Sequence, residues 1–510
     1  MTRVGHGQRA LMVIVATACV AAAGCGARLT PGQHAAGVQL SVRHAVAPGP
    51  AGPTAIPSAD AGAVVPTGPT VAQGGGGPAV PVAPTGGAVV TTGPAAPVAS
   101  GGPAATSGPA APQGSAAVTT KAAAGCAAGA LTASDTGVTP TTVTINNSAD
   151  ITGPVPGLFT TAQDGVKAFV AYFNATNQTV CGRKLALTTN DSQTSEAGDY
   201  AAAQSACANT FAMVGGDSGF DQGGAPVVQQ CGIPDIRASV NSVQRGALAN
   251  VVAASSDDLH WFEPSIASFF SQKFGDKLTQ HAAIAYVNIG VGQQQTARYK
   301  AGFESQGWKV VETVPIDVAD FSYDPFVQKM KGDGVDFVFF IGAEAQYARM
   351  VRSFQSQSFH PDAFLMNPNG YDTVYTQAAG DAAKGSYVYV DAAPFTDAAT
   401  NPELQLYLTW LNRVDPSAEP SWFGELSWSA TRLFVTVAQQ VGPDLTRKAF
   451  LAKLRAVKDW TSNGLTSPQP IGAKTTGSCW TILQWDGAAW GRVSSPAPYT
   501  CTPAAMRVSY

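Results

Sequence analysis

The segment of this chain best suited to binding chemistry is a loop of glycines and short polar residues. Gly215 to Gly219 reads GGDSG, so backbone N–H groups can approach a ligand without side chains in the way. Such a loop, followed by a helix start, favours a carboxylate or another small anion. The alternative for Ser218 is a helix cap, which short polar residues favour anyway.

Catalytic and metal motifs are absent from the sequence. His260, His281 and His360 are far apart and lack the spacing of metal ligands. No nucleophile elbow, phosphate-binding loop or zinc-protease motif occurs. Only 13% of the residues are charged, and no paired carboxylates indicate acid–base chemistry. We therefore expect a protein that is not an enzyme and uses no cofactor.

The N-terminus predicts export. Arg3 and Arg9 precede an apolar run over 10–23 that ends in small residues before Cys25, which is the layout of a signal peptide over 1–24. The run is shorter than the roughly 20 residues that span a bilayer. The segment around Cys25 resembles the lipobox of bacterial lipoproteins, with Ala22 where Leu is usual. That resemblance implies lipid on Cys25; the alternative is an ordinary signal peptide with a chance cysteine.

A linker is predicted over 25–125. Ala, Gly, Pro, Thr and Val dominate it, it has no aromatic residue, and its charges are few. Such a composition cannot bury enough apolar area to offset the entropy of ordering the chain. We interpret the segment as a disordered tether, with coding bias as the alternative explanation of its composition.

The remaining residues, 126–510, are long enough for two lobes of ordinary domain size. The chain has a formal net charge of −4 and no basic block, so we expect no nucleic-acid partner. Six cysteines without CxxC spacing remain in this exported part, and they predict disulfides rather than metal sites. They are Cys126, Cys181, Cys207, Cys231, Cys479 and Cys501. Sequence alone leaves about 15 pairings open.

Strands and helices alternate twice along this part. The first series predicts strands over 143–147, 184–189, 211–214 and 233–236, with helices over 159–174, 197–207 and 222–230. The second predicts helices over 260–274, 293–306, 326–330 and 346–357, with strands over 282–287, 310–314, 337–341 and 364–366. Alternation of this kind is typical of parallel sheets covered on both faces. Two such lobes would enclose a cleft beyond the carboxyl ends of their strands.

Four motifs occur in a specific order along these elements. They are TGP at 152–154, GIP at 232–234, DGVDFVFFIG at 333–342 and LMNPNG at 365–370. Together they resemble the leucine/isoleucine/valine-binding family of periplasmic, type I solute-binding proteins over essentially 139–493. The resemblance implies an α/β fold with two doubly wound parallel-sheet lobes, a three-segment hinge, and capture of a small polar solute such as an amino acid or amide.

The resemblance also implies where the chain crosses between lobes. Crossings near Ala254, Ala392 and Trp460 give a first lobe of 126–254 plus 393–459 and a second of 255–392 plus 460–510. Alternating apolar residues around Asp486 and Gly487 predict a final hairpin that closes the second lobe.

This family topology suggests a disulfide scheme. Cys126 and Cys181 precede the first two strands, Cys207 and Cys231 end two neighbouring helices, and Cys479 and Cys501 flank the final hairpin. We therefore predict the pairs 126–181, 207–231 and 479–501, all away from the cleft.

The family's ligand positions fall on several residues of this chain. Ser218 and Gly219 match the ligand loop, and Ser239 and Asn241 match the next polar contacts, with helix capping as the alternative for the three side chains. Aromatic walls of the cleft would come from Phe159, Tyr371 and Trp428. A core role is equally compatible with Trp428, because helix aromatics are commonly buried.

Asn369 departs from the pattern of the amino-acid binders. Some of them carry Glu in this turn, where it neutralises the ligand's ammonium group. A buried ammonium without a counter-charge costs several kcal/mol. A zwitterionic amino acid therefore needs Glu344 or Asp372 to supply the charge, and base rates favour a solvated surface position for both.

The resulting hypothesis is a lipoprotein exported to the outer face of the cell membrane and anchored there through Cys25. Its partners would be a small-molecule ligand, an ABC permease and the lipid bilayer. Two alternatives remain open: a sensory or scaffold lipoprotein with the same fold, and a hydrolase acting on cell-wall material.

Overall fold

The computed structural model describes residues 126, 131–255 and 258–510, which belong to one compact unit extending from Thr119 to Tyr510. The predicted signal peptide over 1–24, the lipid-modified Cys25 and the linker over 25–125 lie outside the described residues.

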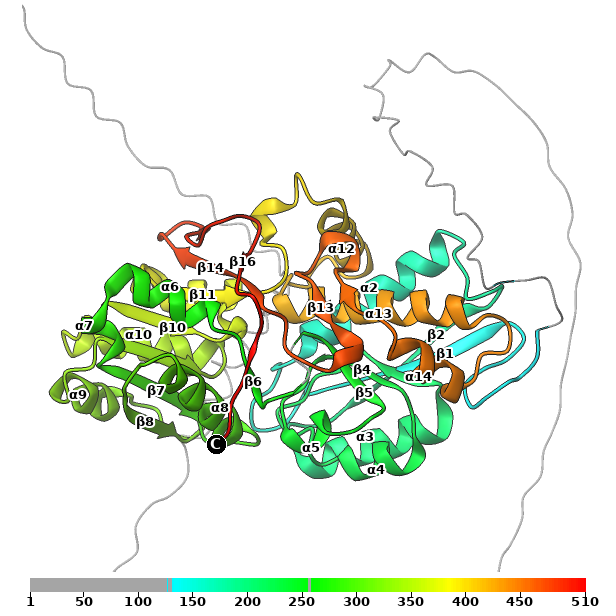
Figure 1. Cartoon of the computed structure of the whole chain (residues 1–510), viewed down its shortest axis with the longest axis horizontal. Helices are drawn as coiled ribbons and strands as arrows, with labels where there is room; N and C mark the ends of the chain where they lie inside the picture. The colour runs from blue at the N-terminus through cyan, green and yellow to red at the C-terminus, as the bar shows by residue number, and fades with distance from the viewer. Residues whose placement is uncertain (1–125, 127–130, 256–257) are drawn as a thin grey trace, which may run out of the picture. The chain divides into compact units, whose positions relative to one another are not determined.

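A five-stranded parallel sheet in the order β2-β1-β3-β4-β5 forms the body that we call the first lobe (Figure 1). Its strands are β1 (Thr142–Ala149), β2 (Lys184–Asp191), β3 (Ala212–Val214), β4 (Asp235–Ser239) and β5 (Val251–Ser255). The short helices between them are α3 (Glu196–Asn209), α4 (Ala225–Cys231) and α5 (Val243–Gly246). Almost every residue of β3, β4 and β5 is buried, as expected of a sheet covered on both faces.

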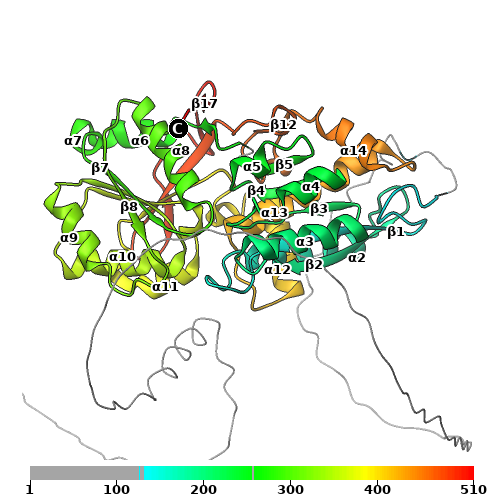
Figure 2. The same cartoon turned by 90° about the horizontal axis from the view of Figure 1, so that it is seen from below.

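Helices from two distant parts of the chain cover the other face of this sheet. α2 (Thr160–Ala175) packs against α12 (Pro402–Val414) and α13 (Trp422–Val441), and α13 contacts α14 (Arg447–Leu454). Figure 1 shows α13 above the sheet and α3 and α4 below it, and in Figure 2, seen from below, α3 and α4 lie in front of α13. In α2 the buried residues Ala162, Val166, Phe169 and Phe173 recur at helical spacing. The apolar face from which this helix was predicted is therefore the face that packs into the core.

A second sheet repeats the same strand order. Its parallel part runs β8-β7-β9-β10-β11, and β14, β15 and β16 add antiparallel pairs at one edge. The strands are β7 (Ala282–Val287), β8 (Val310–Ile316), β9 (Phe337–Ile341), β10 (Ala363–Met366), β11 (Tyr387–Val390), β14 (Cys479–Trp485), β15 (Trp490–Arg492) and β16 (Thr500–Cys501). Its helices are α6 (Ser265–Phe274), α7 (Asp276–Thr279), α8 (Gly292–Ser305), α9 (Asp324–Gly332), α10 (Glu344–Ser356) and α11 (Thr373–Ala379). We call this body the second lobe.

One predicted helix is too long at its start. Residues 260–274 were expected to be helical, but Trp261–Phe262 form strand β6, and α6 begins after Pro264. Proline disfavours helical geometry in the residue before it and fits the start of a helix well. Strand β6 pairs with the C-terminal strand β17 (Met506–Arg507), a long-range pairing that local periodicity does not reveal.

The three predicted disulfides are confirmed: Cys126–Cys181, Cys207–Cys231 and Cys479–Cys501. Cys479 and Cys501 lie opposite each other in the antiparallel pair of β14 and β16. The loops that the bridges close span 55, 24 and 22 residues, and bridges of this kind stabilise secreted domains by about 2–4 kcal/mol each.

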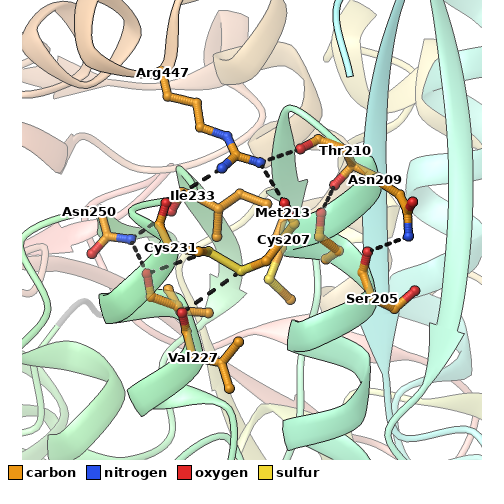
Figure 3. The surroundings of a disulfide bond; sticks show 12 residues. Ser205, Cys207, Asn209, Thr210, Met213, Val227, Cys231, Ile233, Asn250 and Arg447 are labelled. Carbon is orange, nitrogen blue, oxygen red and sulfur yellow. Dashed lines mark hydrogen bonds between the residues drawn. A yellow bond between two sulfur atoms is a disulfide. The ribbon is translucent and has the colours of Figure 1, made fainter. Parts of the chain in front are cut away.

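Arg447 reinforces the Cys207–Cys231 bridge (Figure 3). Its guanidinium donates to the carbonyl oxygens of Cys207 (3.1 Å), Thr210 and Cys231 (3.5 Å), where α3 and α4 end. The last carbonyls of a helix lack partners within the helix, and a cation there is favourable. The covalent bond and the arginine together join both helix ends to α14.

The connections between the lobes contact one another. Ala392 forms an antiparallel bridge with Thr466, and the amide of Ser467 donates to the carbonyl of Asp391 (2.7 Å). Two short strands, β12 (Asp459–Trp460) and β13 (Gln469–Pro470), pair next to this bridge. The predicted lobe boundaries at 254, 392 and 460 stay predictions.

Candidate functional site

A cavity of about 150 Å³ lies between the carboxyl ends of the strands of both lobes. The first lobe contributes the segment before α2, the loops after β3 and β4, and the start of α13, through Leu158, Phe159, Gly219, Ser239, Asn241, Trp422 and Phe423. The second lobe contributes the loops after β7, β9 and β10, the starts of α8 and α10, and side chains of β11 and β14. This is the position that wound parallel sheets provide for ligands.

The polar groups on the first-lobe wall are held by Asp217. Its carboxylate accepts hydrogen bonds from Ser239 Oγ (2.7 Å), from the Ser239 amide (3.2 Å) and from Asn241 Nδ2 (2.5 Å). Asn241 Nδ2 also donates to the carbonyl of Ser218 (3.0 Å). The side-chain protons of Ser239 and Asn241 are therefore used within the lobe, and toward the cavity these side chains present acceptors.

Burial raises the pKa of Asp217 to about 7, against the opposing effect of Arg237. Arg237 is itself fully buried, and it lies 3.7 Å from the carboxylate of Asp221 and 3.7 Å from that of Asp235. The wall of the cavity thus rests on a buried cluster of ionisable groups, in which each member depends on the others for compensation.

Asp150 holds the loop after β3 in the same manner. Its carboxylate accepts from Ser218 Oγ (2.9 Å), from the amide of Gly219 (2.8 Å) and from Ser192 Oγ (2.6 Å). Burial raises the pKa of Asp150 although these hydrogen bonds lower it. Ser218 is completely buried and does not line the cavity, whereas Gly219 does.

Asn369 lines the cavity from the second lobe. Its Oδ1 accepts from Asn367 Nδ2 (2.7 Å), and Asn367 Oδ1 accepts from the amide of Gly342 (3.0 Å). This chain of bonds orients both amides, so the NH₂ group of Asn369 is left for a ligand. The predicted residues that the cavity brings together are Phe159, Gly219, Ser239, Asn241 and Asn369.

Two predicted aromatic contacts lie elsewhere. Trp428 is fully buried in the first lobe, where its Nε1 donates to Glu403 Oε1 (2.6 Å) and its ring packs against Phe169 (4.9 Å between centroids). Tyr371 stacks on Phe395 (4.7 Å), and its hydroxyl accepts from the amide of Phe395 (2.8 Å).

The aromatic wall of the first lobe is instead made by Phe159, Trp422 and Phe423. Phe159 meets Phe423 edge to face with 4.7 Å between centroids. Trp422 begins α13, and Trp428 lies six residues later, which is about 240° around the helix axis. One helix therefore sends Trp422 to the cavity and Trp428 to the core.

Glu344 and Asp372, expected at the surface, are half-buried and line no part of the cavity. Burial, with a smaller contribution from Asp372, raises the pKa of Glu344 to about 8. Asp372 caps α11 by accepting from the amide of Val374 (2.5 Å). The expectation of solvated carboxylates was wrong because both lie where helices start beside the second sheet, and neither is placed to neutralise a ligand ammonium.

Most of the lining is apolar, in contrast to the expected wall of backbone and short polar groups. The second lobe adds Val287, Ile289 and Ile341, together with a donor-rich end formed by Arg298, Tyr299, Tyr389 and Trp480. Sequence reasoning missed this end. Arg298 lies in the helix predicted over 293–306, directly before Tyr299. An arginine beside an apolar stripe is common on surface helices and is no signal by itself.

The lobes touch at the mouth of the cavity. The amide of Val291 donates to the carbonyl of Gly219 (3.1 Å), and Gln295 Nε2 donates to the carbonyl of Asn241 (3.2 Å). Gly290 has φ +48°, and a Cβ atom there would lie 2.0 Å from the Gly219 oxygen. Glycine is thus required at 290 for this contact.

With the cavity placed, comparison with known proteins identifies the family. Residues 142–489 match the model of the family described as periplasmic binding protein. The chain belongs to that family. A leucine-, isoleucine-, valine-, threonine- and alanine-binding protein of Pseudomonas aeruginosa is 27% identical over 123 residues, or 24% of this chain. The chain spans 32% of the length of that relative.

Solved structures of similar proteins share the fold. A fatty acid ABC transporter substrate-binding protein from Thermomonospora curvata has a TM-score of 0.61 at 15% identity, over 72% of this chain and 95% of its own. A solute-binding protein of an ABC transporter from R. palustris, in complex with benzoate, has a TM-score of 0.58 at 14% identity, over 71% and 98%.

These findings confirm the resemblance to leucine/isoleucine/valine-binding proteins and the α/β fold with parallel sheets. The family comprises exported substrate-binding proteins of ABC transporters rather than enzymes, and its members bind small molecules. In the described ranges no helix combines the length and the apolar character needed to cross a bilayer. Nor do the described His, Cys, Asp and Glu side chains group in threes that could hold a metal ion.

Proposed function

We propose that this chain is the solute-binding lipoprotein of an ABC-type importer. In this proposal lipid on Cys25 anchors it to the outer face of the cell membrane, the segment 25–125 tethers the binding unit, and the two lobes close on a small organic solute. The protein delivers the solute unchanged to a permease and catalyses no reaction on it.

The observation that supports the proposal most is the cavity, since it is enclosed by strand ends of both lobes in a chain of the periplasmic binding protein family. Closure would follow from the higher affinity of the ligand for the closed arrangement. We propose Phe159, Gly219, Ser239, Asn241 and Asn369 as ligand contacts, and we extend the set to Trp422 and Phe423.

A thermal-shift panel of amino acids, amides and small carboxylic acids tests solute binding on the full mature chain. A ligand at a hundred times its Kd stabilises the folded state by about 2.7 kcal/mol, which is readily seen as a rise in Tm. At least one compound of the panel is expected to stabilise. No stabilisation by any compound, together with unchanged uptake of all of them by cells lacking the gene, would contradict the importer.

Membrane attachment is tested separately with Cys25→Ser. The wild-type chain is expected to incorporate a labelled fatty acid and to sediment with membranes, and the variant to lose both properties. An unlabelled wild-type chain released into the medium would contradict the lipid anchor and leave solute binding untouched.

A further inference from the structure

The donor-rich end of the cavity holds a cation that forms no ion pair with the described residues. Arg298 in α8 is 5% exposed and is the one charged side chain among the described residues that line the cavity. Its Nε donates to the carbonyl of Trp261 (2.6 Å). Within the described residues the two terminal nitrogens make no hydrogen bond, and no carboxylate lies within 4.0 Å of them. A buried charge of this kind needs a partner.

Trp480 adds a second unused donor to this end. Trp480 is 5% exposed and lines the cavity. Its Nε1 is buried and has no hydrogen-bond acceptor among the described residues. Indole nitrogen can only donate, and guanidinium nitrogen can only donate, so both call for the same kind of ligand atom, an acceptor.

Two tyrosines lie beside these residues and form a hydrogen bond with each other. The guanidinium carbon of Arg298 lies 5.0 Å from the ring centroid of Tyr299, the hydroxyls of Tyr299 and Tyr389 are 2.5 Å apart, and Tyr389 meets Trp480 edge to face at 5.1 Å. An anionic acceptor bound there would take charge-assisted hydrogen bonds, which are stronger than neutral ones.

Among the described residues the acids near this end form no ion pair with Arg298, although Glu263 is close enough for the Arg298 charge to lower its pKa. Glu263 is buried, its Oε2 has no partner in the described part of the chain, and burial raises its pKa well above the usual range despite Arg298. Asp391 accepts from Trp422 Nε1 (2.8 Å) and Gln469 Nε2 (2.9 Å) and belongs to the hinge.

The opposite wall cannot take the same ligand group. Ser239 and Asn241 donate to Asp217, Asn241 also donates to the Ser218 carbonyl, and the amide of Gly219 donates to Asp150. These groups therefore have no free donor for a ligand carboxylate. The rest of the lining is hydrocarbon, aromatic or amide, and no acidic side chain in it could neutralise an ammonium group.

We propose that the cavity binds a small apolar carboxylic acid as its anion, with the carboxylate on Arg298 at the end that Trp480 also lines, and the hydrocarbon body toward Phe159 and Phe423. The inference rests on the proposed solute-binding function and names its ligand class. A cavity of about 150 Å³ suits a body the size of benzene or a branched aliphatic chain.

Isothermal titration of the wild-type chain with matched compounds tests the ligand class. Benzoate is compared with benzamide and benzylamine, and 4-methylpentanoate with leucine, which adds an ammonium group to a similar body. Each acid is expected to bind at least about tenfold more tightly than its neutral or amino counterpart, as for hydrogen bonds to a charged group. Equal or tighter binding of benzamide, benzylamine or leucine would overturn the inference while the solute-binding function stands.

Variants then locate the carboxylate. R298M keeps the apolar stem of the side chain and is expected to weaken acid binding by about 10–100-fold, whereas R298K retains part of the affinity. K300M, on the exposed face of the same helix, is the control with unchanged affinity. Full acid affinity in R298M would overturn the inference. If R298M does not fold, the comparison of acids with amides in the wild-type chain decides the ligand class. If no compound binds in either the thermal-shift panel or the titrations, the proposed solute-binding function is contradicted as well.

Discussion

The two walls of the cavity hold their polar groups in opposite ways. On the first lobe, Asp217 and Asp150 engage the donors of Ser239, Asn241 and Gly219 in a buried network. On the second lobe, Arg298 and Trp480 have donors that no described residue accepts. The polar groups of the first wall are paired before a ligand arrives, while in the proposed binding mode the donors of the second wall are paired by the ligand.

This difference separates residues that maintain the shape of the site from residues that recognise the solute. Variants on the first wall should change the free energy of unfolding more than ligand preference. Variants on the second wall should change affinity more than stability.

The largest effect is expected from D217A. The substitution removes the buried acceptor of the Ser239 hydroxyl, one of the two acceptors of the Asn241 amide and one of the carboxylates near Arg237, and it should lower the free energy of unfolding by about 3–5 kcal/mol. Urea unfolding followed by tryptophan fluorescence measures the loss. D217N, which keeps one acceptor and the volume, should lose less, and a loss under about 1 kcal/mol in D217A would show that the network does not maintain the wall.

The contact between the walls is tested by G290A. A Cβ atom at 290 collides with the Gly219 oxygen when the lobes touch, so affinity for the tightest acid of the panel should fall about tenfold or more through strain of the closed arrangement. The control is G307A, because Gly307 also has positive φ (+82°) but no atom near a new Cβ. Equal affinities of the two variants would mean that ligand binding does not need this contact.

The recognition role of the second wall is sharpened by W480F. Removing an N–H that no described residue accepts should change ligand-free stability by about 1 kcal/mol or less and weaken acid binding about tenfold. W485F provides a control on the same strand, because Trp485 does not line the cavity. A parallel loss of affinity in both variants would assign the effect to the strand rather than to the indole nitrogen.

The smallest expected effect is a change in the pH dependence of stability. Asp217 has a pKa of about 7 in the folded chain and an ordinary value of 3.8, so between about pH 4 and pH 7 the folded state holds a proton that the unfolded state has released. Rising pH therefore favours unfolding in this window, by at most about 1.4 kcal/mol per pH unit for one group. The slope measured by urea unfolding should be shallower in D217N. An unchanged slope would show that Asp217 is ionised throughout the window.

Local patterns predicted the elements of the fold well. The strand over 337–341 is a continuous apolar run, and α2 has its apolar residues at helical spacing, so both follow from periodicity that depends on neighbours in the chain. Failures occurred where distant segments meet. Trp261 and Phe262 form a strand because Met506 and Arg507 pair with them. The residues around position 261 contain no pattern that predicts so distant a partner.

For this protein the sequence determined the alternation of strands and helices and the family, and the resemblance to the family gave the three disulfide pairs and placed Gly219, Ser239, Asn241 and Asn369 at one cavity. These depend on chain order and on the rule that parallel strands end at one edge. The tertiary structure decided that Trp422 rather than Trp428 faces the cavity, that Asp217 accepts from the donors of the first wall, and that Arg298 forms no ion pair with the described residues. Those properties depend on the direction of each side chain and on which polar groups pair across the fold. The spacing of residues along the chain specifies neither the direction nor the pairing.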